Sequence, residues 1–164
     1  MMVTKNGDIY VANTGKWNIY HFNPQGAMVG AFIELYGEVF GLATDSIGRI
    51  YVANAGSKTI DILTPDLKLL KKRKIAAWRN NEGMWPMIAI DSKNRIYCVS
   101  QNEKKIVVYD TVAPNFPCLG EIRNDTNNQP LFTNPLGIAI DSQDNIYITE
   151  KLLGKVLKIK PVFN

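Results

Sequence analysis

The sequence is poor in histidine and cysteine, and this scarcity excludes several kinds of active site. It contains one histidine, His21, and two cysteines, Cys98 and Cys118. A single imidazole argues against a Ser/His/Asp or Cys/His catalytic relay, and the chain has no Gly-x-Ser-x-Gly nucleophile motif. The two cysteines match no CxxC or Cys/His spacing, so they do not predict a zinc site.

Long apolar runs and concentrated charge of one sign are also missing. No segment approaches the roughly 18 to 20 consecutive apolar residues that a membrane-spanning helix needs, so we expect no membrane insertion. The first residues lack the basic and then apolar pattern of a signal peptide. The formal net charge is +4 without a clustered basic stripe, which argues against a dedicated nucleic-acid binder. With 46% hydrophobic and 21% charged residues, the 164-residue chain is typical of one globular domain.

One sequence motif is present in several copies. Three copies align without a gap: they begin at Gly41, Met87 and Gly137 and read GLATDSIGRIYV, MIAIDSKNRIYC and GIAIDSQDNIYI. A fourth copy begins at Val3 and has Thr4 at the position of the aspartate. The tyrosines of the four copies are separated by 41, 46 and 50 residues, a period that predicts propeller blades or solenoid units.

Within each period the pattern is that of β-strands rather than helices. Short runs rich in Ile, Val and Tyr alternate with Asp/Ser/Asn/Gly turns, and four strands in succession make one antiparallel blade. In the second period we expect strands at 42–44, 49–53, 59–63 and 68–75. The inner strand is apolar, whereas the outer strand carries lysines that discourage edge-to-edge pairing. We place Cys98 and Cys118 on strands separated by a third strand, beyond disulfide reach, and expect two free thiols.

The predicted fold class is therefore all-β, a β-propeller built from four-stranded antiparallel blades. A single domain over 1–164 would hold four blades, at approximately 1–36, 37–80, 81–128 and 129–164. The last blade lacks its outer strand because few residues follow the third strand at 155–160. An open arc exposes apolar sheet faces that need covering. The chain is thus a piece of a longer polypeptide, which we prefer, or it self-associates, or it closes on four blades.

The repeats resemble the NHL-repeat family. The best match is PLGIAID at 135–141 followed by NIYI at 145–148. The resemblance implies a propeller that binds partners on one loop face, and it implies an extracytoplasmic location. Peptidylglycine-type lyases with similar repeats hold zinc with several histidines, which this chain lacks. Gluconolactonase-like propellers hold a divalent metal with Glu, Asp and Asn, and the residues that such a site would recruit here are Glu38, Asn54, Asn102 and Glu150.

The recurring aspartates Asp45, Asp91 and Asp141 raise the question of calcium binding or acid–base chemistry. Each is followed by Ser and by further polar or Gly residues, which is the composition of a turn whose Asp side chain accepts bonds from nearby backbone amides. We therefore interpret these aspartates as structural. The repeated tyrosines are interpreted in the same way, as residues that fill space between blades.

The loops between blades and the turns between second and third strands are predicted to form the binding face. The candidate partner- or ligand-binding residues are Lys16, Trp17, Asn54, Lys58, Trp78, Arg79, Asn102, Lys104, Glu150 and Lys151. Aromatic and Arg side chains dominate many interfaces, so we expect Trp17, Trp78 and Arg79 to be exposed. Trp85 and Phe132 are expected to fill the gap between blades instead.

These features favour a non-catalytic interaction or scaffold module that binds a protein or an extended ligand, with no catalytic residue, metal or cofactor. The expected partner is a protein or a second copy of the chain. The alternative is a metal-dependent enzyme of the lactonase or lyase kind. A second alternative is RNA binding through Lys16, Lys58 and Arg79, but the densest basic run, 71–74, lies on an expected outer strand, where solvation explains it.

Overall fold

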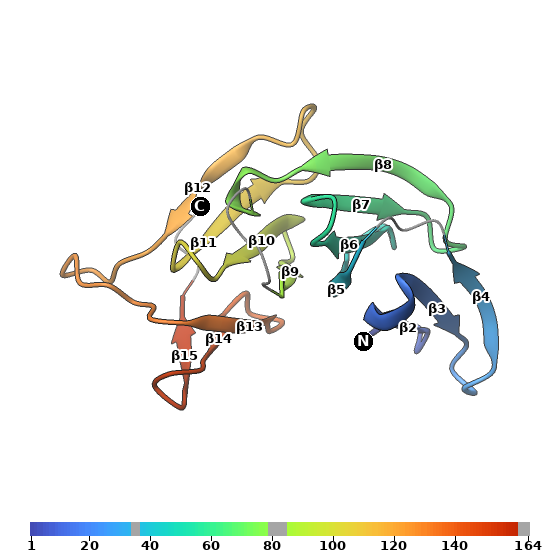
Figure 1. Ribbon diagram of the computed structural model, residues 1–164, viewed down its shortest axis with the longest axis horizontal. Coiled ribbons are helices and arrows are strands. Elements are labelled where there is room, and N and C mark those ends of the chain that lie inside the picture. Colours follow the sequence, from blue (N-terminus) through green and yellow to red (C-terminus); the bar gives the residue numbers. More distant parts are fainter. Residues whose placement is uncertain (34–36, 79–84, 161–164) are drawn as a thin grey trace. The chain divides into compact units, whose positions relative to one another are not determined.

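The computed structural model describes residues 1–33, 37–78 and 85–160. Apart from two short 3-10 helices, η1 (Thr14–Lys16) and η2 (Ala76–Trp78), all the regular elements in these ranges are β-strands (Figure 1). In the described ranges there is no helix long and apolar enough to cross a membrane. The chain divides into two compact units, Met1–Ala76 and Ala77–Asn164, and each contains two antiparallel sheets.

The first unit holds two four-stranded sheets, each with its strands in chain order. The strands of the first sheet are β1 (Met2–Val3), β2 (Ile9–Asn13), β3 (Asn18–Phe22) and β4 (Met28–Phe32). Those of the second are β5 (Val39–Thr44), β6 (Ile50–Asn54), β7 (Thr59–Leu63) and β8 (Leu69–Lys74). The strands expected in the second repeat are confirmed to within a few residues. This order of four antiparallel strands is that of a propeller blade.

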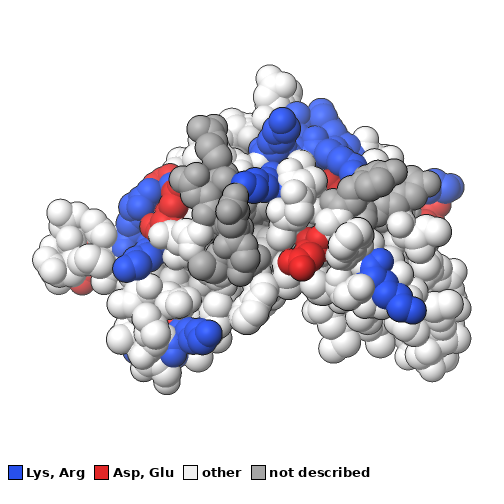
Figure 2. All heavy atoms as spheres, viewed as in Figure 1, with Lys and Arg blue, Asp and Glu red and all other residues white. Residues whose placement is uncertain are grey.

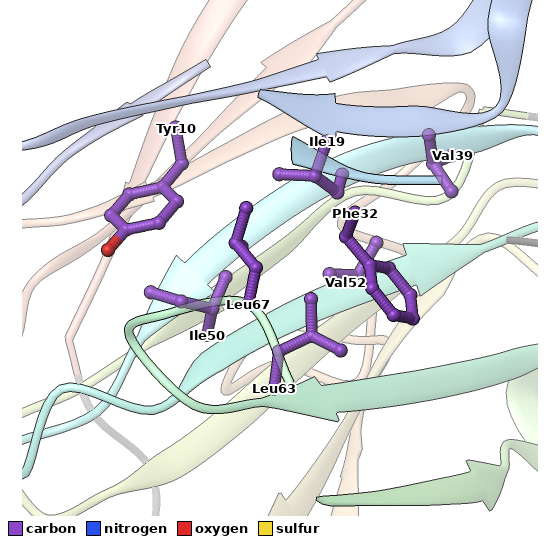
Figure 3. Packing of buried hydrophobic residues seen from close by; sticks show 8 residues of the cluster. All are labelled: Tyr10, Ile19, Phe32, Val39, Ile50, Val52, Leu63 and Leu67. Atoms are coloured by element: carbon purple, nitrogen blue, oxygen red, sulfur yellow. The ribbon is translucent and has the colours of Figure 1, made fainter. Parts of the chain in front are cut away.

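Apolar side chains from both sheets form the core of the first unit, where β2 packs against β5. Figure 3 shows eight of them, which are Tyr10, Ile19, Phe32, Val39, Ile50, Val52, Leu63 and Leu67. The outer strand β8 is different, because five of its six residues are exposed. Figure 2 shows Lys and Arg gathered over this strand, as the sequence predicts for an outer edge that must not pair with another sheet.

The second unit holds one sheet of four strands and one of three. The strands of the first are β9 (Ile88–Ile90), β10 (Arg95–Ser100), β11 (Lys105–Asp110) and β12 (Cys118–Ile122). Those of the second are β13 (Pro135–Ile140), β14 (Ile146–Glu150) and β15 (Lys155–Ile159), so the last blade has three strands as predicted. Because β11 lies between β10 and β12, Cys98 and Cys118 are kept apart, and both are free thiols.

The recurring aspartates organise the turn between the first two strands of their blades. In the third blade, Oδ1 of Asp91 accepts bonds from the backbone N–H groups of Lys93 and Arg95 at 3.0 and 2.9 Å. Its Oδ2 accepts from Arg95 Nε at 2.6 Å and from the Tyr97 hydroxyl at 3.0 Å. Burial, reinforced by the Asp91 carboxylate, raises the pKa of Tyr97. Asp45 and Asp141 accept the equivalent bonds, so the structural interpretation of these aspartates is confirmed.

Candidate functional site

In the first unit, the predicted binding residues lie in the turns between the second and third strands. Lys16 and Trp17 follow β2, and the Trp17 side chain is exposed on a left-handed backbone with φ of 56°. Lys58 lies in the turn before β7 and is half-buried. Asn54 is buried at the end of β6, where its Nδ2 donates to Asp61 Oδ2 at 3.1 Å. This bond joins β6 to β7, so the Asn54 amide stabilises its own blade.

In the second unit, Asn102 and Lys104 are exposed in the turn between β10 and β11, as expected. The expected exposure of Trp78 is wrong, because only 1% of this side chain is exposed. Its indole Nε1 donates a bond of 3.0 Å to the carbonyl oxygen of Val99, so the polar edge of the ring has a buried partner. Arg79 lies outside the described residues.

Trp85 and Phe132 were both expected to fill space, and they differ. Phe132 is buried, whereas the Trp85 side chain is 52% exposed, so the expectation for Trp85 is wrong. The Trp85 backbone N–H donates to Gln101 Oε1 at 3.3 Å. Nζ of Lys151 lies 6.0 Å from the centre of the Trp85 ring, within the range of a cation–π contact. Trp85 therefore connects residues from two neighbouring blades.

Glu150 ends β14 and carries a buried carboxylate, with 2% of the residue exposed. Oε2 accepts three hydrogen bonds from the segment that leads into β13: Thr133 N at 3.2 Å, Thr133 Oγ1 at 2.6 Å and Asn134 N at 2.9 Å. These donors fix the orientation of the carboxylate. Oε1 is also buried but has no hydrogen-bond partner among the residues that the structure describes. Oε2 therefore has three hydrogen-bond donors, whereas Oε1 has none in the described part of the chain.

Gln101, which directly follows β10, has the complementary arrangement. Its Oε1 accepts the Trp85 N–H, while its buried Nε2 has no partner within the described ranges. An unpaired buried polar group costs about 1 to 3 kcal/mol, so such groups in a native protein call for an explanation such as a ligand. We call Trp85, Gln101, Glu150 and Lys151 the turn cluster. Trp85 contacts Gln101 and Lys151, and Glu150 directly precedes Lys151 in the chain. The four residues supply a carboxylate oxygen, an amide donor, an ammonium group and an aromatic ring.

Sequence reasoning identified two of the four members of this cluster, Glu150 and Lys151. Glu150 is the carboxylate at a position where the other repeats have Asn13, Asn54 and Ser100, and this difference is visible in the sequence alone. Gln101 was missed, because a glutamine one residue past a strand end has no distinctive pattern. Trp85 was assigned to packing because aromatic side chains so often pack in protein cores.

The four residues considered for a metal site do not meet in one unit. Glu38 and Asn54 belong to the first unit, and Asn102 and Glu150 belong to the second. Among residues 1–33, 37–78 and 85–160 no group of three or more His, Cys, Asp or Glu side chains could hold a metal ion. No chemical step is assigned to a metal ion here.

No family model matches the chain, and no curated protein matches it. Solved structures do. A streptogramin B lyase matches with a TM-score of 0.74 and 18% identity over 99% of this chain and 51% of its own. Virginiamycin B lyase from Staphylococcus aureus matches at 0.68 and 15%, over 97% and 54%. Hydrazine synthase from Kuenenia stuttgartiensis matches at 0.69 and 16%, over 97% and 44%.

These matches show a β-propeller fold, and the predicted fold class is confirmed. Membership of the NHL-repeat family is not confirmed, because no family model matches. The chain spans about half the length of the two lyases. The matched proteins are enzymes by name, and at 15% to 18% identity the likeness shows the fold alone. They indicate no partner for this chain.

Proposed function

We propose that this chain is part of a β-propeller enzyme of the lyase kind, whose substrate binds at the turn cluster. The observation that carries the proposal is the buried Glu150 carboxylate, of which one oxygen accepts three bonds and the other accepts none in the described part of the chain. The similarity to two lyases supports the reaction class. At 18% and 15% identity it carries no residue-by-residue assignment.

The chemistry available to Glu150 is proton removal. A carboxylate held in place by Thr133 and Asn134 keeps Oε1 in one position, which is what a general base needs. In an elimination, Oε1 would take a proton from a carbon next to an electron-withdrawing group. The C–H electron pair would form the new double bond, and the leaving group would depart with its bonding electrons and then gain a proton.

The other members of the turn cluster would bind the substrate. Gln101 Nε2 has hydrogens to donate, and the oxygen of a carbonyl group next to the activated carbon would accept one. The exposed Trp85 ring offers a flat apolar surface, and the Lys151 ammonium beside it attracts negative charge. The site therefore favours a substrate with a carbonyl group and an apolar or aromatic body.

The test uses the full-length protein from its natural source, with a streptogramin B antibiotic as the probe. Products are followed by liquid chromatography and mass spectrometry. An elimination adds no water, so the summed product mass equals the substrate mass, whereas a lactonase reaction adds one water. Glu150→Gln keeps the shape of the side chain and removes the base. Asp125→Asn is the matched control, since Asp125 is an exposed turn residue whose carboxylate accepts hydrogen bonds from the backbone N–H groups of Asn127 and Gln129.

We expect Glu150→Gln to lower kcat by about 10²- to 10⁴-fold, the usual contribution of a general base. Asp125→Asn should keep the rate of the natural protein. Equal rates for Glu150→Gln and the natural protein would remove Glu150 from the mechanism. A product heavier by one water would contradict the lyase assignment, and no turnover at all would contradict this substrate class.

A further inference from the structure

The first blade departs from the repeat at two linked positions. In the other three blades an aspartate accepts bonds from the residue four positions later and from the repeated tyrosine. In the first blade the aspartate position is Thr4, and the position four residues later is Asp8 instead of Arg or Asn. In the first blade the carboxylate therefore lies four positions later in the turn, where the other blades have an Arg or Asn that donates to the aspartate.

The displaced carboxylate pairs with the single histidine of the chain. Nε2 of His21 lies 2.9 Å from Asp8 Oδ1, and the two side chains are 16% and 30% exposed. His21 is the cross-strand neighbour of Tyr10, and their rings stack with centres 4.3 Å apart and an angle of 13° between planes. The Tyr10 hydroxyl bonds to the carbonyl oxygen of Pro65 at 2.8 Å. In Figure 3 this hydroxyl points away from the apolar cluster.

These groups line a pocket of about 370 Å³ that lies entirely within the first unit. Its volume is in the range that small ligands occupy. Asp8, Tyr10 and His21 contribute the polar wall, and β4 and the turn before β8 contribute the rest. The remaining lining residues are Val29, Gly30, Pro65, Asp66 and Leu67.

The charge of the lining determines the class of ligand. Asp8 and Asp66 line the pocket, and no Lys or Arg is among the described residues that line it. The Asp66 carboxylate already binds the Lys68 ammonium at 2.7 Å and the Thr64 hydroxyl. Oδ2 of Asp8 has no hydrogen bond among the residues described, so it is the acceptor that remains. Val29, Pro65 and Leu67 add an apolar wall next to this acceptor.

We infer that this pocket binds a small organic cation, an amine or guanidinium with a short apolar body, whose charged group pairs with Asp8. The apolar part would lie against Val29 and Leu67, and the ring pair of Tyr10 and His21 would form the floor. The site is separate from the turn cluster and does not depend on the proposed lyase activity.

Titration of the full-length protein with n-butylamine tests this, with 1-butanol as a neutral probe of the same shape. Binding is followed by the NMR signals of the His21 ring. We expect a saturable shift with the amine and none with the alcohol. Asp8→Asn should weaken amine binding about fivefold or more, because the ion pair is lost, while the shape of the pocket is kept. Asp125→Asn, with the same change of charge in the second unit, should bind the amine unchanged.

Val29→Lys provides a second variant that does not depend on the fold tolerating a change at Asp8. Val29 is 56% exposed on β4 and lines the pocket, so a lysine there would place a competing ammonium at its rim. Amine binding should again fall by about fivefold or more. The inference is overturned if the amine produces no saturable shift, if butanol shifts the His21 signals equally, or if both variants bind the amine as the natural protein does.

Discussion

The hydroxyl of Tyr10 donates a hydrogen bond of 2.8 Å to the carbonyl oxygen of Pro65, and so joins the first two sheets of the chain. The equivalent tyrosines, Tyr51, Tyr97 and Tyr147, donate instead to the aspartate of their own turn. Thr4 at the aspartate position frees Tyr10 for this longer-range contact. With Thr4 at this position, the carboxylate of the turn comes from Asp8, which pairs with His21.

Tyr10→Phe should destabilise the protein modestly. The ring would still fill its place in the core, but the Pro65 carbonyl would lose its donor. The expected loss in the free energy of unfolding is about 1 kcal/mol, measured by urea denaturation with a common m-value. An unchanged urea midpoint would show that the bond contributes nothing to stability.

Asp91→Asn should be far more damaging than Asp141→Asn. Asp91 faces Arg95 at 2.6 Å, and the two side chains are 0% and 7% exposed. Neutralising Asp91 removes the carboxylate charge that faces the buried Arg95 guanidinium at 2.6 Å, at a cost of about 3 kcal/mol. Asp141 accepts a hydrogen bond from the neutral Asn145, so replacing Asp141 removes the counterion of no charged side chain in this bond. Thermal and urea unfolding of both variants check the order, and equal losses would contradict it.

Stability should fall between about pH 4 and pH 2, in part through Asp141. The side-chain hydrogen bond from Asn145 lowers the pKa of Asp141 to about 2. Because the folded pKa is lower than the unfolded one, this contribution is present above the unfolded pKa and is lost as the pH falls through the folded pKa. Lys68 lowers the pKa of Asp66 to about 2 in the same way.

Asp141→Asn should therefore make stability less dependent on pH in this window, without removing the dependence that Asp66 contributes. Urea midpoints measured from about pH 5 to about pH 2 give the comparison. The prediction fails if the natural protein and the variant lose stability with the same slope.

The two thiols should react at very different rates. Cys98 is fully buried in β10, and burial raises its pKa well above the usual value, whereas Cys118 is exposed in β12. The thiolate is the reactive form, so an alkylating reagent should modify Cys118 first and Cys98 only after unfolding. Peptide mass spectrometry after brief labelling identifies the site. Rapid modification of Cys98 in the folded protein would contradict the burial of β10.

Much of the fold could be predicted from the sequence because its signals are local and repeated. A strand alternates with period two, a turn needs its Asp and Gly within a few residues, and a repeat of 41 to 50 residues places one blade after another. These signals located the strands of the second blade, the missing outer strand of the last one and the capping role of Asp45, Asp91 and Asp141. None of them depends on how distant segments meet.

Only the tertiary structure decided which side chains are buried and which have a polar atom without a hydrogen-bond partner. Trp78 and Trp85 lie seven positions apart, yet one is buried against Val99 and the other is exposed beside Lys151. Whether Glu150 keeps an unpaired oxygen depends on donors 16 and 17 residues earlier in the chain. Burial and pairing of single polar groups arise from contacts between segments far apart in sequence, and repeat periodicity carries no information about them.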